Sequence, residues 1–162
     1  MNDSGHKAID LATLAGRWFL GALFVYTGLE KGLDPAAFLK LLRQYDLVHA
    51  PFLLNSIAAA LPWFEVFCGA LLLAGIAVRG VALTLAGILA PFTAAVWHRA
   101  LVLQSAHFIP FCAIKFDCGC GVGEVLICHK LIENGALVLL AVWLLAGRGR
   151  LFALRYSLSK TA

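Results

Sequence analysis

Four of the five cysteines of this 162-residue chain lie close together, and their spacing indicates sulfur chemistry. Cys112, Cys118, Cys120 and Cys128 fall within seventeen residues, and the run at 117–121 reads Asp-Cys-Gly-Cys-Gly. A disulfide inside Cys-x-Cys closes a small strained ring, and strained disulfides are readily reduced and exchanged. Alternatively, either sulfur could bond a more distant partner, Cys128 or Cys112. The pattern predicts thiol–disulfide exchange, with Cys118 and Cys120 as the active pair and Cys128 or Cys112 as the resolving thiol.

Charged neighbours bear on this chemistry because the thiolate is the attacking species. Lys115, His129 and Lys130 are near in sequence and favour a thiolate. Asp117 opposes it as a charge, but could assist proton removal as a general base. We therefore count Asp117 among the candidate catalytic residues.

Two other interpretations of the cysteines stay open. The four sulfurs could form two static disulfides that hold a loop. Cys118, Cys120 and Cys128 could instead join His129 in a Cys₃His metal site, although zinc sites more often use Cys-x₂₋₄-Cys pairs. The fifth cysteine, Cys68, lies in an apolar run, where a free cysteine behaves as a small hydrophobic residue.

The elements that position these residues must lie in a membrane. Apolar residues make up 62% of the chain and charged residues 14%, with a mean hydropathy of +0.88, against about 25% charged in an average soluble domain. So few charges cannot cover a water-facing surface, which excludes a soluble enzyme, a disordered chain and a nucleic-acid-binding protein. An integral membrane protein remains.

Four apolar runs are long enough to cross a bilayer, which takes roughly 20 residues each. They cover about 11–28, 53–78, 81–103 and 126–147, and no cleavage site follows the first, so we expect it to be a retained span. The prediction is a single domain over 1–162: an all-α, four-transmembrane-helix bundle. Between the first two spans, Asp34-Pro35 predicts the start of a short interfacial helix.

Basic residues indicate the orientation. Six Lys and Arg residues fall on the side that carries both termini and four on the other side. Because cytoplasmic segments are enriched in Lys and Arg, we expect cytoplasmic termini in a bacterial inner membrane. The Cys-Gly-Cys segment would then face the periplasm.

Ionisable residues inside spans are costly and often mark a site. Arg17 interrupts the first run and Glu65 the second, so we expect them to face each other. His98 and Arg99 lie near the outer end of the third run, and Glu30 and Lys31 lie near that of the first. The outer end of the fourth carries Glu124, His129, Lys130 and Glu133. A polar pocket is predicted there, with Glu65, Arg17 and His98 as candidate cofactor-binding residues.

Several blocks resemble a known family of membrane proteins. Arg17, Gly21 and the Gly-Leu-Glu-Lys run at 28–31 are similar to the opening of the DoxX family, and Pro62, Glu65 and Gly69 match its second block. The run at 117–121 resembles the motif of the MauE branch. That branch typically continues with Cys-Phe-Gly, where this chain has Cys-Gly-Val-Gly at 120–123.

The resemblance implies a redox-associated four-span protein that works with a periplasmic thioredoxin-like partner. It further implies a task in maturing disulfide-containing proteins of the methylamine-dehydrogenase type, as a thiol–disulfide oxidoreductase. DoxX relatives are linked to quinol oxidation, which makes a quinone a candidate cofactor, and a homo-oligomer is a candidate assembly. The alternative is a non-enzymatic membrane subunit or chaperone whose outer loop is stapled by disulfides.

Overall fold

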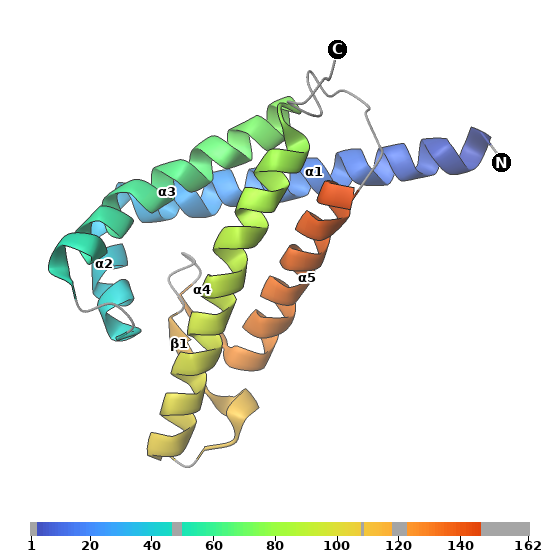
Figure 1. The fold of residues 1–162 in the computed structure, drawn as a ribbon. Coiled ribbons are helices and arrows are strands. Elements are labelled where there is room, and N and C mark those ends of the chain that lie inside the picture. The colour runs from blue at the N-terminus through green and yellow to red at the C-terminus, as the bar shows by residue number, and fades with distance from the viewer. Residues whose placement is uncertain (1–2, 47–49, 108, 118–122, 147–162) are drawn as a thin grey trace.

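The computed structural model describes residues 3–46, 50–107, 109–117 and 123–146, and helices form nearly all of this part (Figure 1). Four of the helices are long and apolar enough to span a membrane. They are α1 (Asp3–Leu33), α3 (Pro51–Ala74), α4 (Val78–His107) and α5 (Ile127–Ala146). The prediction of an all-α protein with four spans is confirmed.

The helix ends differ from the predicted ones for local reasons. Helix α1 continues five residues past Gly28, because this glycine lies at the contact between α1 and α3 and does not form a turn. A Cβ at Gly28 would lie 2.7 Å from the carbonyl oxygen of Pro62. Helix α3 ends before the predicted residue 78, because Gly75 adopts a left-handed conformation with φ 71°. The Ile76 N–H then donates to the Leu71 carbonyl at 2.9 Å, which closes the helix end.

The predicted short helix between the first two spans is present as α2 (Pro35–Gln44). A carboxylate oxygen of Asp34 accepts a hydrogen bond from the Ala37 N–H at 2.9 Å, and Pro35 occupies the first helical position. Both features favour a helix start. Phe38 is the buried residue of α2, and the centroid of its ring lies 5.7 Å from the Lys31 ammonium nitrogen.

The long helices associate as two antiparallel pairs, α1 with α3 and α4 with α5. The two pairs diverge in Figure 1. Gly21 and Gly69 allow α1 and α3 to approach closely, since a Cβ on Gly69 would lie 2.6 Å from the Gly21 carbonyl oxygen. Small residues are a common basis of helix packing in membranes, where the backbones must come close to gain contact.

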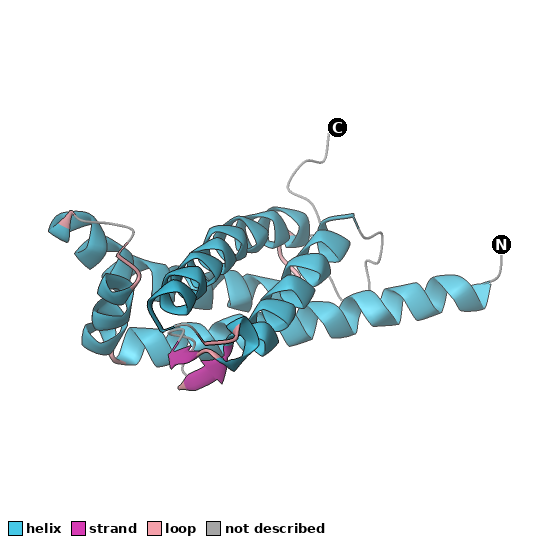
Figure 2. Ribbon diagram, turned by 90° about the horizontal axis from the view of Figure 1, so that it is seen from below, coloured by secondary structure: helices cyan, strands magenta, loops and turns pink. Residues whose placement is uncertain are grey.

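A small hairpin connects α4 to α5 (Figure 2). It comprises the 3₁₀ turn η1 (Phe111–Ala113) and the antiparallel strands β1 (Lys115–Asp117) and β2 (Glu124–Leu126). These strands were not predicted, because three residues are too few to show an alternating pattern.

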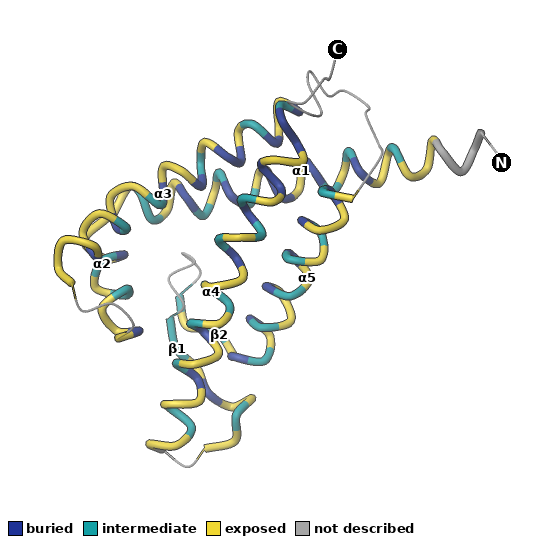
Figure 3. Tube along the Cα trace, in the orientation of Figure 1, coloured by how far each residue is buried: buried dark blue, intermediate teal, exposed yellow. Residues whose placement is uncertain are grey.

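Side chains are buried along only one side of each long helix (Figure 3). Large apolar side chains such as Trp18, Phe64, Trp97 and Leu139 are exposed on the other side. This distribution suits helices whose outer surface contacts lipid. One buried cluster links the four long helices, and a second joins Tyr45 at the end of α2 to α4, the hairpin and the first turn of α5.

Candidate functional site

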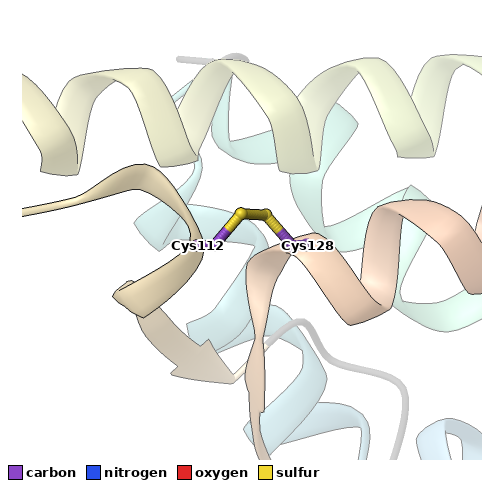
Figure 4. The surroundings of a disulfide bond; sticks show 2 residues. All are labelled: Cys112 and Cys128. Atoms are coloured by element: carbon purple, nitrogen blue, oxygen red, sulfur yellow. A yellow bond between two sulfur atoms is a disulfide. The ribbon is translucent and has the colours of Figure 1, made fainter.

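A disulfide between Cys112 and Cys128 joins the start of the hairpin to the first turn of α5 (Figure 4). The two Cα atoms are 5.0 Å apart and sixteen positions apart in the sequence. Cys128 is half-buried, whereas Cys112 is exposed. This disulfide can therefore be reached from outside the protein.

The hairpin inside this disulfide loop is anchored on the helices. In the register of the two strands, Asp117 lies opposite Glu124 at the end nearest the connection between them. At the other end, the Ile127 N–H donates a hydrogen bond to the Ile114 carbonyl at 3.1 Å. Ile114 and Ile127 are each only 1% exposed. A T-shaped contact of Tyr45 with Phe116 fixes the hairpin against the end of α2.

The predicted active cysteines, Cys118 and Cys120, lie outside the described residues. They belong to the connection from Asp117 to Gly123, at the end of the hairpin opposite the disulfide. Cys128, proposed from the sequence as a resolving thiol, is bonded to Cys112. This pairing could not be predicted, because spacing alone does not choose among four sulfurs.

Within the helices, the carboxylate of Glu65 forms an ion pair with Lys31, at 2.6 Å between Oε2 and Nζ. Both side chains are buried, at 5% and 10% exposure. The expectation that Arg17 faces Glu65 was wrong. Lys31 follows Arg17 by fourteen residues in α1, which is about 21 Å along the helix axis. The antiparallel register of α1 and α3 therefore places Arg17 near the far end of α3.

This ion pair lines a cavity of about 60 Å³ between the four long helices. Helix α5 contributes Lys130, Glu133 and Asn134 to its wall, which are spaced i, i+3 and i+4 and so share one face. Lys130 pairs with Glu133 at 3.1 Å. The side-chain nitrogen Nδ2 of Asn134 is buried and makes no hydrogen bond, although Asn134 is only 2% exposed.

A second cavity, of about 240 Å³, adjoins the hairpin. Glu30, Lys31 and Asp34 line it from the helices, and Asp117 and Gly123 line it from the hairpin. Lys31 thus borders both cavities. Its side chain therefore lies between the space beside the hairpin and the interior of the helices.

The other candidate residues lie apart from these cavities. Arg17 is buried, at 2% exposure, but is not among the residues that line either cavity. His98 is exposed on α4 and does not line them either. Of the predicted cofactor-binding residues, Glu65 alone lines the interior cavity.

The proposed Cys₃His metal site is only partly described. Within the described ranges, no group of three or more His, Cys, Asp or Glu residues has the geometry of a metal site. Cys128 is engaged in the disulfide and His129 is exposed, while Cys118 and Cys120 are outside those ranges. A site of this kind would require the disulfide to open.

Sequence reasoning gave no role to Asn134 and did not identify the partner of Glu65. The signal for Asn134 was available in the spacing of Lys130, Glu133 and Asn134 on one helix face. Amphipathic spacing of this kind inside an apolar helix indicates a polar interior surface.

Comparison with known proteins gives one match. A family model described as methylamine utilisation protein MauE matches residues 9–147, which is most of the chain. No curated protein and no solved structure shows a significant match. The finer resemblance to the DoxX family stays a prediction.

Proposed function

Because this chain belongs to the MauE family of methylamine utilisation proteins, we propose that it is a membrane thiol–disulfide exchange protein. It acts with a thioredoxin-like partner on the periplasmic side of a bacterial inner membrane. Its task is the maturation of disulfide-containing proteins of the methylamine-dehydrogenase type. Family membership supports the association with methylamine utilisation, and the cysteines support the chemistry.

The observation that carries this proposal is the reachable disulfide at the base of the hairpin. Exposed disulfides are the labile or catalytic ones more often than buried ones, and Cys112 is exposed. In the sequence, Cys118 and Cys120 fall between the two strands of the same hairpin. Four cysteines within seventeen residues would provide an active pair and a second pair that can be oxidised or reduced in turn.

The exchange proceeds by two successive nucleophilic substitutions at sulfur. A thiolate of Cys118 or Cys120 attacks a disulfide of the partner, so that a mixed disulfide forms and one partner sulfur leaves as a thiolate. The second thiolate of the pair then attacks the mixed disulfide. The partner leaves as a dithiol and this chain keeps the disulfide, and the reverse sequence transfers the disulfide to the partner.

Trapping of the mixed disulfide tests the proposal. The single variants Cys118→Ser and Cys120→Ser remove one thiol of the pair, so that the mixed disulfide with the partner cannot be resolved. We expect one of them to accumulate a covalent complex with a thioredoxin-like protein, visible on a non-reducing gel and lost on reduction. Cys68→Ser is the matched control, since Cys68 is a free, buried cysteine within α3.

The competing function is that of a non-enzymatic subunit or chaperone whose disulfides only hold the outer loop, and the Cys112–Cys128 disulfide is also compatible with this role. In that case neither variant would trap a complex, and both would support maturation of the client protein in cells as well as the unaltered chain does. That pair of results would overturn the exchange function.

A further inference from the structure

Helix α2 lies at the level of the membrane surface. It joins the end of α1 at Leu33 to the start of α3 at Pro51, and both of these helices are membrane spans (Figure 1). Its ten residues extend about 15 Å, which is about half of the hydrocarbon core. On either side of it, Leu33 is 76% and Phe52 84% exposed. A short helix between such apolar side chains is typical of a segment in the interface between lipid and water.

One face of α2 is held against the rest of the protein. Phe38 and Tyr45 are spaced i, i+7 and are only 5% and 8% exposed. The ring of Phe38 lies beside the Lys31 ammonium, and the ring of Tyr45 contacts that of Phe116 in the hairpin. The opposite face of α2 is therefore turned away from the protein.

This outward face carries two cations. Ala36, Lys40 and Arg43 are spaced i, i+4 and i+7, about half a turn away from Phe38, and Lys40 and Arg43 are exposed. Together with Leu39 and Gln44 they line a groove of about 390 Å³. Helix α2 contains no acidic residue, and no carboxylate in the described part of the chain forms an ion pair with either cation.

The two nearest acidic residues in the sequence lie at the ends of α2 and do not line the groove. Asp34 precedes the helix, where its carboxylate accepts a hydrogen bond from the Ala37 N–H. Asp46 follows the helix, where its backbone N–H donates to the Arg43 carbonyl at 3.2 Å. The groove therefore carries a net positive charge.

The lining of the groove favours a phosphate that is attached to an apolar body. A guanidinium group binds phosphate oxygens through two parallel hydrogen bonds, and an ammonium group binds them as a point charge. The amide of Gln44 adds a further donor, while Ala36 and Leu39 provide an apolar wall. A zwitterionic head group would bring a third cation beside Lys40 and Arg43, so the charge favours a head group that is net negative.

We propose that the outward face of α2 binds the head group of an anionic phospholipid. The phosphate lies between Lys40 and Arg43, the glycerol lies beside Ala36 and Leu39, and the acyl chains enter the leaflet in which α1 ends and α3 begins. The bound lipid holds α2, and through Tyr45 the hairpin, at the membrane surface. The site uses no cysteine, so this inference goes beyond the proposed function and does not depend on it.

Lipid titration in detergent tests the proposal. The full chain is delipidated in a nonionic detergent and titrated with phosphatidylglycerol or phosphatidylcholine, and the bound lipids are counted by native mass spectrometry. We expect phosphatidylglycerol to bind about tenfold more tightly. Lys40→Gln and Arg43→Gln should each weaken its binding about threefold, and both together about tenfold. Lys115→Gln is the matched control, because Lys115 is an exposed lysine of β1 outside the groove and its loss should change nothing.

Two further measurements locate the site and identify the source of the phosphate. A phosphatidylglycerol with a photoreactive group near its head group should label the peptide that contains residues 35–44, and the double variant should lose this label. The soluble compound sn-glycerol 3-phosphate carries the same phosphate without acyl chains. In excess over the lipid, it should leave the bound phosphatidylglycerol in place.

Equal affinities for the two lipids would overturn the proposal. A double variant that binds phosphatidylglycerol as tightly as Lys115→Gln does, or labelling confined to other helices, would overturn it as well. Displacement by sn-glycerol 3-phosphate would show a site for soluble phosphates and would overturn the lipid site. Because the variants keep every cysteine, a failure here leaves the trapping of a mixed disulfide as an independent test of the proposed function.

Discussion

At the scale of single residues, the Lys31–Glu65 ion pair dominates the interior of the molecule. Its two side chains are buried, and they connect α1 to α3 beside the interior cavity that Lys130 and Asn134 of α5 also line. Breaking a buried pair by removing one partner costs about 3–5 kcal/mol, whereas replacing both partners by apolar residues is often neutral.

The two partners are accordingly expected to be strongly coupled. Lys31→Met should lower the free energy of unfolding by about 3 kcal/mol, because it leaves the Glu65 carboxylate buried without its cation. Lys31→Met combined with Glu65→Leu should recover most of this loss. Equilibrium unfolding in detergent micelles measures both, with Lys40→Met, at an exposed lysine of α2, as the control. A single variant as stable as the control would show that the pair does not stabilise the fold.

The residues of this cavity could be predicted only in part. Glu65 stands out because an acidic residue inside an apolar run must be neutral, paired or next to a polar cavity. Its partner does not stand out, because the sequence gives no relative depth for residues of two different helices. Lys31 becomes the partner through the register of α1 against α3, which depends on contacts such as those of Gly21 and Gly28.

At the scale of elements, the sequence predicted structures that depend on neighbouring residues but not those that depend on contacts between distant segments. Helix α2 could be predicted because Asp34 and Pro35 act within one turn. The hairpin could not, because its strands have three residues each and their stability comes from the buried Ile114 and Ile127 and from the disulfide. The glycines of α1 and α3 were noted as family motifs, and their packing role emerged only from the structure.

The close contact of α1 with α3 allows a direct test of this packing. In Gly69→Ala the added Cβ would lie 2.6 Å from the Gly21 carbonyl oxygen, and we expect a loss of about 1–3 kcal/mol in unfolding free energy from overpacking. In Gly87→Ala, on α4, the added Cβ meets nothing within 4 Å. The higher helix propensity of alanine should then stabilise the protein slightly. Thermal unfolding of both variants in the same detergent compares them, and equal midpoints would contradict the packing role.

At the scale of the whole molecule, hydropathy gave the four spans and their order. It could not give the arrangement of the helices in two pairs, because side chains that face lipid and side chains that face the core are equally apolar. Trp18 and Leu20, for example, are close in α1, yet Trp18 is 52% exposed and Leu20 fully buried.

The orientation in the membrane is a further prediction at this scale. We expect the hairpin on the periplasmic side and the turn between α3 and α4 on the cytoplasmic side, because basic residues are more numerous on the latter. Glu124→Cys and Gly80→Cys place one new thiol on each side, at exposed positions. A membrane-impermeant maleimide added to intact cells should label the first variant above the background of the unaltered protein and leave the second at background. The opposite pattern would place the cysteine-bearing hairpin in the reducing cytoplasm and remove the setting of the exchange chemistry.

The glycine contacts between α1 and α3 also limit how this protein can move. At Gly21 and Gly69 the two backbones leave no room for a Cβ, so that sliding or separating α1 and α3 would lose this tight packing. The turn between α3 and α4 has positive φ at Gly75 and Ala77, and Ala77 is buried in the cluster that links the four long helices. A movement of α4 and α5 away from α1 and α3 would therefore have to break the contact between Tyr45 and Phe116, which ties the hairpin to the end of α2.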